Sequence, residues 1–307
     1  MTRISSFGQQ QLLLRGMFNN QKAVFEAQQQ VTTGKKADDY AGTAGDTATI
    51  LGAKNFKSRI ESYQSSIDTI RGKLDANDVQ IEGMLGAMRE LKSTAQTALA
   101  NNQAEGLIPL IEQNFKFMVN GLNTNLDGTF LFSGAKTGTQ PVNVQEISDL
   151  AGLGSIDEAF DNSDIGFKAR IADGVEVEFG LLADELGKDA FQAMHDLYDY
   201  NQTNPEALEG ELDQASWDFI QTKLAEIDKV IDDMLQTQTR NGLTFERLEV
   251  VDNQHLDTSN YLETYIGDLE NVDIAEAITR LNNDQVALEA SYRAVGTLTQ
   301  LSLLNFL

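Results

Sequence analysis

The stretch that decides the fold lies near the carboxyl end, where residues 274–295 read IAEAITRLNNDQVALEASYRAV. Its members at alternating intervals of four and three are Ile274, Ile278, Leu281, Gln285, Leu288, Tyr292 and Val295. This alternation is the a/d pattern of a coiled coil, in which one stripe of a helix faces a partner helix. The pattern therefore predicts a long carboxyl-terminal helix with a helical partner.

The amino-terminal end carries a second ladder of the same spacing. Its rungs are Ile4, Phe7, Gln11, Leu14, Phe18, Gln21, Phe25 and Gln28. Two such ladders at opposite ends of the chain predict that the terminal helices pair with each other. Apolar residues also lie off the ladders: Leu12, Leu13, Met17, Val24, Leu298, Leu301, Leu303 and Leu304. A lone pair of helices cannot bury all of this surface, so we expect contacts with further copies of the chain.

Composition and charge exclude several classes of protein. The chain has 307 residues and a net charge of −24, which argues against nucleic-acid binding because phosphates require a basic face. The ends, residues 1–36 and 274–307, carry net charges of +4 and −1, so the remainder carries −27. We therefore expect ends buried in an assembly and a solvated middle. The chain has no cysteine, and no run of 18 apolar residues that would span a membrane.

The middle of the sequence predicts long helices. Residues 54–100 keep the same alternation from Ile60 to Ala98 without a proline, which predicts a helix roughly 70 Å long. A shorter helix is predicted over 109–122, with Pro109 in its first turn. A further pattern runs from Trp217 to Leu269, and Asn241-Gly242 is a predicted kink or break in it.

Residues 137–185 differ from the helical segments around them. They contain eleven acidic and two basic residues, and the run GVEVEFG at 174–180 alternates as a strand does. We expect a small β-rich insert that caps the far end of the paired helices. A short helix is predicted at about 188–201, and Asn204-Pro205 is the predicted start of the next helix.

Three motifs resemble the bacterial flagellin and hook-associated protein family. They are QQQVTTGKKADDYAG at 28–42, LDGTFLFSG at 126–134 and AITRLNNDQVALEASY at 277–292. The last motif, with the ending LSLLNFL at 301–307, is most similar to the hook-associated proteins of the hook–filament junction. The resemblance covers roughly residues 1–136 and 216–307 and leaves the insert without a counterpart.

The resemblance implies a mainly α fold, a long-helix coiled-coil rod with paired terminal helices and a small β-rich inserted domain. Its expected parts are a terminal assembly domain (1–32 plus 274–307), a helical rod domain (33–136 plus 186–273) and the insert (137–185). We expect the subunit interface to involve Phe7, Leu14, Phe18, Phe25, Ile278, Leu281, Leu288, Tyr292 and Val295.

By the same resemblance, the chain is a structural subunit that connects hook to filament. Its implied partners are copies of itself, a neighbouring hook-associated protein, flagellin and a flagellar export chaperone, with no nucleic acid and no membrane. Its implied location is outside the cell, after type III export without a cleaved signal peptide. The apolar run Leu12–Leu14 is too short for the core of a secretory signal.

Two alternatives remain open: a filament flagellin, and a secreted glycan- or cation-binding protein whose acidic insert holds a ligand. No enzyme activity, cofactor or metal is expected. The two histidines, His195 and His255, each fall in a predicted helix and are expected to pack rather than catalyse. Residues 161–166 faintly resemble a calcium loop, but Ile165 and Ala172 stand where oxygen ligands are required.

Overall fold

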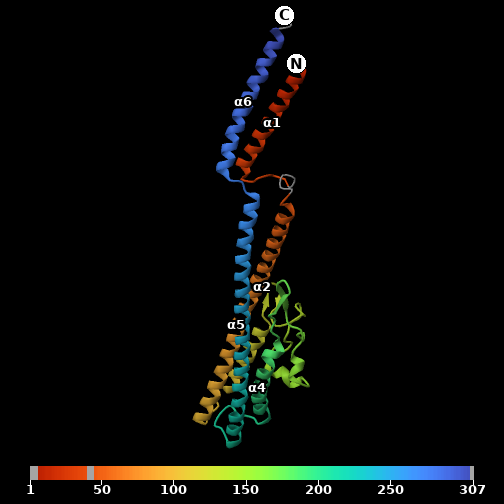
Figure 1. Cartoon of the computed structure of the whole chain (residues 1–307). Coiled ribbons are helices and arrows are strands. Elements are labelled where there is room, and N and C mark those ends of the chain that lie inside the picture. The colour runs from red at the N-terminus through yellow and green to blue at the C-terminus, as the bar shows by residue number, and fades with distance from the viewer. Residues whose placement is uncertain (1–5, 40–44, 305–307) are drawn as a thin grey trace. The chain divides into compact units, whose positions relative to one another are not determined.

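Long helices dominate the part of the chain that the computed structural model describes, residues 6–39 and 45–304 (Figure 1). The helices are α1 Ser6–Thr33, α2 Thr47–Asn101, α3 Leu107–Leu122, α4 Ala183–Thr203, α5 Gln214–Glu270 and α6 Ile274–Leu304. The long helices pair as α1 with α6 and α2 with α5, so the predicted mainly α fold class is confirmed. The surroundings of side chains 6, 7, 10 and 298–304 are not described. The predictions for Ile4, Phe7, Leu298, Leu301, Leu303 and Leu304 therefore lie outside the described residues.

The chain divides into two compact units. One unit comprises Met1–Arg59 with Asp257–Leu307, and the other comprises Ile60–Leu256. Within the second unit, the α2 ladder predicted from the sequence is the core. Ile67, Ile81 and Leu91 are fully buried, together with Phe115 of α3 and Ile227 of α5. Unbroken 3-4 spacing lets α2 present apolar side chains to its neighbours along its whole buried face.

Helix α5 continues through Asn241-Gly242, so the break that the sequence allowed there does not occur. Asn241 is buried, and its side-chain amide donates a 2.9 Å hydrogen bond to the backbone carbonyl of Leu74 on α2. About one turn along the pair the two helices are joined again, where Gln238 donates to the carboxylate of Asp78 at 3.1 Å. The Asn241 amide nitrogen thus has a partner across the helix pair, whereas its buried Oδ1 atom has none among the described residues. A polar contact of this kind is specific and does not end the helix.

The strands form two short antiparallel hairpins, one before the insert and one within it. The hairpin β1 Asn125–Leu126 with β2 Thr129–Phe130 precedes the insert. The insert holds β3 Lys168–Ala172 with β4 Val175–Glu178 and two 3₁₀ turns, Ile147–Gly152 and Ile156–Ala159. The predicted strand at 174–180 is thus present as β4. Gly174 has a φ of +74°, a conformation that glycine adopts without steric cost at the turn before β4.

The β3–β4 hairpin packs against the sides of α2 and α5, so the prediction that the insert caps the far end of the helices is wrong. Ile171 and Val177 share a buried cluster with Ile67 and Ile70 of α2 and Leu248 of α5. The alternation of β4 gives the hairpin one apolar face, and that face needs an apolar surface to cover it.

Asn204-Pro205 follows the end of α4 and does not start the next helix. The backbone N–H of Asn204 donates to the carbonyl of Tyr200, and α5 begins ten residues later at Gln214. Asp213 caps α5, because its carboxylate accepts the backbone N–H of Ser216 at 2.7 Å. This bond and that from the Ser216 side chain lower the pKa of Asp213.

Candidate assembly surface

Helices α1 and α6 run antiparallel, side by side (Figure 1). Asn20 of α1 makes the central polar contact: its side-chain amide donates to the hydroxyl of Ser291 at 2.7 Å and to the carbonyl of Ala287 at 3.3 Å. Nearer the linkers, Arg280 donates to the side-chain oxygen of Gln30 at 3.4 Å. These contacts place Asn20 level with residues 287–291, and they fix the register of the pair.

The stripe of α1 that faces α6 is not the ladder predicted from the sequence. The half-buried and buried side chains of the facing stripe are Leu13, Met17, Asn20, Val24, Ala27 and Val31. This stripe also has 3-4 spacing, but it includes residues that the sequence placed off the ladder. Ala27 is 1% exposed, and its small side chain suits a close approach of the two helices.

On α6, about half of the predicted ladder faces α1. Leu281, Leu288 and Val295 are half-buried on the facing stripe, where Ala277 is fully buried. The remaining members of the ladder, Ile274, Ile278, Gln285 and Tyr292, are exposed, and Ile278 and Tyr292 keep 44% and 49% of their surface in solvent. The predicted interface residues of α6 therefore divide into those that hold the helix pair together and those that face outward.

Exposed apolar side chains also lie on α1. Phe18 and Phe25 are 60% and 66% exposed, while Leu14 is half-buried beside them; the side chain of Phe7 lies outside the described residues. Large aromatic side chains that remain in solvent are costly, because each holds a large apolar area in water. A surface of this kind marks an interaction site when its members form a continuous patch.

The helix pair has two edges, one on each side of the facing stripes. The exposed side chains of α1 and of α6 named above lie on the same edge, opposite the one described first. Residues seven apart share a face of a helix, so Ala23 lies with Gln30 on α1, and Ala287 lies with Arg280 on α6. Because Gln30 and Arg280 touch, these two faces share one edge. We name it the small-residue edge; it consists of Gly16, Ala23, Gln30, Arg280, Ala287 and Ala294.

The opposite flanks of the facing stripes must then share the other edge. We name this the aromatic edge; it consists of Gln11, Phe18, Phe25, Ile278, Gln285 and Tyr292. All of its members are exposed. The register set by Asn20 places Phe18 about level with Tyr292, and Phe25 about level with Gln285. The aromatic edge therefore runs along both helices, and none of its six members is charged.

The linkers beside the helix pair are joined by backbone and ionic contacts. Lys36 donates its backbone N–H to the carbonyl of Glu270 at 2.7 Å, and Val272 donates to the carbonyl of Gly34 at 2.9 Å. The Glu270 carboxylate also pairs with Lys35 at 3.4 Å and with Lys54. The hydrogen bond from Lys54 lowers the pKa of Glu270; burial opposes this change, and Lys35 adds to it.

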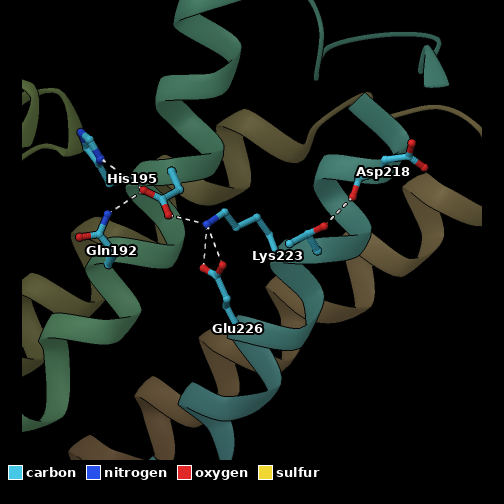
Figure 2. Close-up of polar contacts among 7 residues, drawn as sticks. Gln192, His195, Asp218, Lys223 and Glu226 are labelled. Carbon is cyan, nitrogen blue, oxygen red and sulfur yellow. Dashed lines mark hydrogen bonds and ion pairs between the residues drawn. The ribbon is translucent and has the colours of Figure 1, made fainter. Parts of the chain in front are cut away.

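Helix α4 is joined to α5 by a cluster of charged side chains (Figure 2). The ammonium group of Lys223 lies 2.5 Å from a carboxylate oxygen of Asp196 and 2.8 Å from one of Glu226. Gln192 donates to Asp196 at 2.7 Å, and the ring of His195 lies 4.0 Å from the same carboxylate. Burial acts to lower the pKa of Lys223, but the bonds to Asp196 and Glu226 outweigh burial and raise it.

The histidine His255 and the faint calcium loop take part in contacts that hold the fold together. His255 is buried, stacks on Tyr63 at 5.7 Å and lies 2.7 Å from the carbonyl oxygen of Ile171, so it helps to hold the β3–β4 hairpin. Asp161, the first residue of the faint calcium loop, pairs with Lys136 at 2.7 Å. Among the described residues, no three His, Cys, Asp or Glu side chains gather as metal ligands.

None of the described helices combines the length and the apolar character that crossing a bilayer requires.

Comparisons with known proteins agree with the resemblance that the sequence motifs indicate. Residues 224–307 match the family described as the bacterial flagellin C-terminal helical region. No curated protein sequence matches the chain. One of the similar solved structures is from Vibrio parahaemolyticus and is assigned as a flagellar hook-associated protein. It is 18% identical, with a TM-score of 0.60 over 75% of this chain and 98% of that one.

The second similar structure is Bacillus cereus FlgL. It is 16% identical, with a TM-score of 0.51 over 65% of this chain and 98% of that one. At these identities the structural matches establish the fold, while the sequence match concerns the carboxyl-terminal helices. Flagellins are structural proteins, so the match supports the expectation that the chain is not an enzyme. Residues 224–307 of the chain therefore match the C-terminal helical region of bacterial flagellins, and the fold is similar to that of flagellar hook-associated proteins.

Proposed function

We propose that this chain is a structural subunit of the bacterial flagellum that connects the hook to the filament and assembles with copies of itself through α1 and α6. The observation that carries the proposal is the aromatic edge. Phe18 and Phe25 keep 60% and 66% of their surface in solvent although α1 already has a partner helix. Burial of such an edge against further subunits gives the free energy that an axial assembly requires.

The similar structures support the junction role. The Vibrio parahaemolyticus protein is assigned as hook-associated, and the Bacillus cereus protein is FlgL. The carboxyl-terminal motif at 277–292 is the part of the sequence most similar to hook–filament junction proteins. On this proposal the neighbours in the axis are another hook-associated protein and flagellin, an export chaperone holds the chain before export, and the mature subunit lies outside the cell.

The predicted interface set, and the division into a terminal assembly domain, a rod domain and an insert, remain parts of this proposal. Within that set, Leu281, Leu288 and Val295 contact α1 in the single chain. Their proposed role is therefore to hold the terminal pair together. Phe18, Phe25, Ile278 and Tyr292, which are exposed, are the members proposed to contact other subunits directly.

A filament flagellin is the second candidate, because the matched family model is that of the flagellin C-terminal region. The number and position of copies separate the two roles. A junction protein occupies a short zone between hook and filament, whereas a flagellin is present along the whole filament.

Electron microscopy of a strain that lacks this chain tests the proposal. We expect hooks without attached filaments, flagellin shed into the medium, and recovery of filaments when the full chain is restored. Gold-labelled antibody should mark one zone next to the hook. Normal filaments in the deletion strain would contradict an axial role, and label along the whole filament would replace the junction role with that of a flagellin.

A further inference from the structure

The two edges of the α1·α6 pair have complementary shapes. On α1 the aromatic edge presents Phe18 and Phe25, seven residues apart, and the small-residue edge presents Gly16 and Ala23 at the same interval. Seven residues of helix rise about 10.5 Å, so projecting rings and open positions recur at equal distance along the two edges. Along α1, Gly16 and Ala23 each lie two residues before a phenylalanine, which is an axial offset of about 3 Å.

The small-residue edge has room to receive a side chain. A Cβ atom built on Gly16 meets nothing within 4 Å. The register set by Asn20 places Ala294 about level with Gly16 and Ala287 about level with Ala23, so each open position is formed by two small residues, one from each helix. A ring that enters between two such residues can contact both helices, as knobs enter holes in coiled coils.

We infer that the contact between copies is heterologous, with the aromatic edge of one copy docked on the small-residue edge of the next. This inference rests on the proposed function and specifies its interface. A like-edge contact would bring Phe18 and Phe25 against the same rings of another copy and leave Gly16 and Ala23 uncovered. A heterologous contact covers both edges of every copy except at an open end, and it generates rings or helical arrays.

The charges on the two edges permit this contact. The aromatic edge carries no charged residue, and its polar members are Gln11 and Gln285. The small-residue edge carries one charge, on Arg280, whose guanidinium is paired with Glu276 of its own helix at 2.8 Å. No like charges oppose each other across the contact, and no ion pair must be broken to form it.

The size of the contact sets how strongly two copies associate. Three partly exposed rings and Ile278 offer on the order of 400 Å² per copy, about half of the roughly 800 Å² that a stable interface buries on each partner. One contact alone is therefore weak. We expect the free chain to stay monomeric when dilute and to associate where many contacts form together in the growing axis.

Paired cysteines test the inference, because the natural chain has none. Gln21 lies three residues after Phe18 and four before Phe25, and Asn19 lies in the same relation to Gly16 and Ala23. Both side chains are exposed. The variants are Gln21→Cys, Asn19→Cys and the double variant. Thr279→Cys is the control, because the exposed Thr279 is turned about 100° away from both edge residues beside it, Ile278 and Arg280. Flagella from cells that express each full-length variant are oxidised and examined on non-reducing gels.

We expect disulfide dimers when Gln21→Cys and Asn19→Cys are co-expressed, and a ladder of multimers from the double variant. Each single variant should remain monomeric, as should the control. Dimers from Gln21→Cys alone would overturn the inference in favour of a like-edge contact. Absence of every disulfide, with normal amounts of the chain in the flagella, would also overturn it. Absence of the wild-type chain from isolated flagella would instead remove the proposed function.

A second variant tests the small-residue edge by filling it. Gly16→Trp should not disturb the α1·α6 pair, because the added side chain starts in open space and glycine is a poor helix former. It should lower the amount of chain incorporated into flagella about ten-fold or more, equivalent to roughly 1.4 kcal/mol per contact. Thr279→Trp, on the outer face of α6, should incorporate normally. Normal incorporation of Gly16→Trp would show that this edge is not a contact.

Discussion

The side-chain amide of Asn20 donates a 2.7 Å hydrogen bond to the hydroxyl of Ser291, a residue 271 positions away in the sequence. The Ser291 hydroxyl in turn donates to the carbonyl of Ala287, which also accepts from Asn20. A polar group in a helix seam specifies register, because a shifted alignment leaves it without a partner. Asn20 therefore decides which side chains of α1 and α6 face each other and which form the two edges.

The facing stripe and the aromatic edge should respond differently to the same chemical change. Leu288→Asp with Val295→Asp places carboxylates against α1, where unpaired charge costs several kcal/mol. We expect the pair to open, so that hydrogen exchange of α1 and α6 accelerates and the chain is lost from flagella. Ile278→Asp with Tyr292→Asp should also block incorporation, but with hydrogen exchange unchanged, because these side chains are already in solvent. Equal exchange in the two double variants would contradict the assignment of the stripes.

The carboxylate of Glu270, beside the linkers, should make the stability of the fold depend on pH in the acid range. The pKa of Glu270 is lower in the folded chain than when unfolded, so its ion pairs stabilise the fold above the unfolded pKa of about 4.3. That stabilisation is lost as pH falls through the folded pKa. Glu270→Gln should lower the free energy of unfolding at pH 7 by on the order of 1 kcal/mol, and the difference should vanish under strong acid.

Thermal unfolding of wild type and Glu270→Gln across this pH range measures the effect. Glu263→Gln is the matched control: its side chain is 71% exposed although it pairs with Lys57 at 3.0 Å, and an exposed pair adds little stability. A difference between wild type and Glu270→Gln that persists at the lowest pH would contradict the electrostatic origin of the effect.

Lys223 should contribute through its charge and not only through packing. Its side chain is 12% exposed and bound to Asp196 and Glu226. Lys223→Met keeps the apolar stem but leaves Asp196 without its cation, which should cost about 1–2 kcal/mol in the free energy of unfolding. Because the folded pKa of Lys223 is raised, its contribution is present below the unfolded value of about 10.4 and is lost as pH rises through the folded pKa.

Chemical denaturation at neutral pH, followed by helix circular dichroism, measures the Lys223→Met change. Lys22→Met serves as the control, since Lys22 is 76% exposed and its i,i+4 pair with Glu26 is weak. Equal effects of the two substitutions would show that the cluster in Figure 2 does not stabilise the junction of α4 with α5.

The insert should stabilise the helices that it covers. Ile171 is fully buried against α2 and α5, so Ile171→Ala should lower the free energy of unfolding by about 2–4 kcal/mol. Ile165→Ala, in the same insert but 62% exposed, should change it by less than about 0.5 kcal/mol. Denaturant unfolding monitored on helix content compares them. An unchanged transition in Ile171→Ala would mean that the hairpin contributes nothing to the packing of α2 with α5.

Much of the fold was predictable because its longest helices repeat one simple pattern. The α2 ladder from Ile60 to Ala98 has no competing apolar stripe, so the predicted face is the buried one. The helix α1 has two apolar stripes of equal spacing, and local sequence does not rank them. The aromatic residues made the wrong stripe prominent, whereas Asn20 and Ala27, which belong to the correct one, are polar or small and give little hydrophobic signal.

The candidate assembly surface was predictable in composition but not in arrangement. The sequence placed Phe18, Phe25, Ile278 and Tyr292 among the expected interface residues, and the structure leaves these four exposed. It did not single out Gly16, Ala23, Ala287 and Ala294 as a surface. Their small side chains give no periodic hydrophobic signal, and only the intervals of seven residues link them within each helix.

The sequence by itself determined the long helices and their amphipathic character, because spacing of apolar residues acts within one helix and needs no knowledge of its neighbours. Two ladders of the same spacing also indicated that the chain ends pair. Tertiary structure alone decided which stripe of α1 faces α6, that the Asn241 amide binds the carbonyl of Leu74, and that the β3–β4 hairpin packs along the helices. Each of these depends on a partner far away in the sequence. Where two sets of side chains have equal local preference, only the hydrogen bonds and close contacts with the partner decide which set is buried.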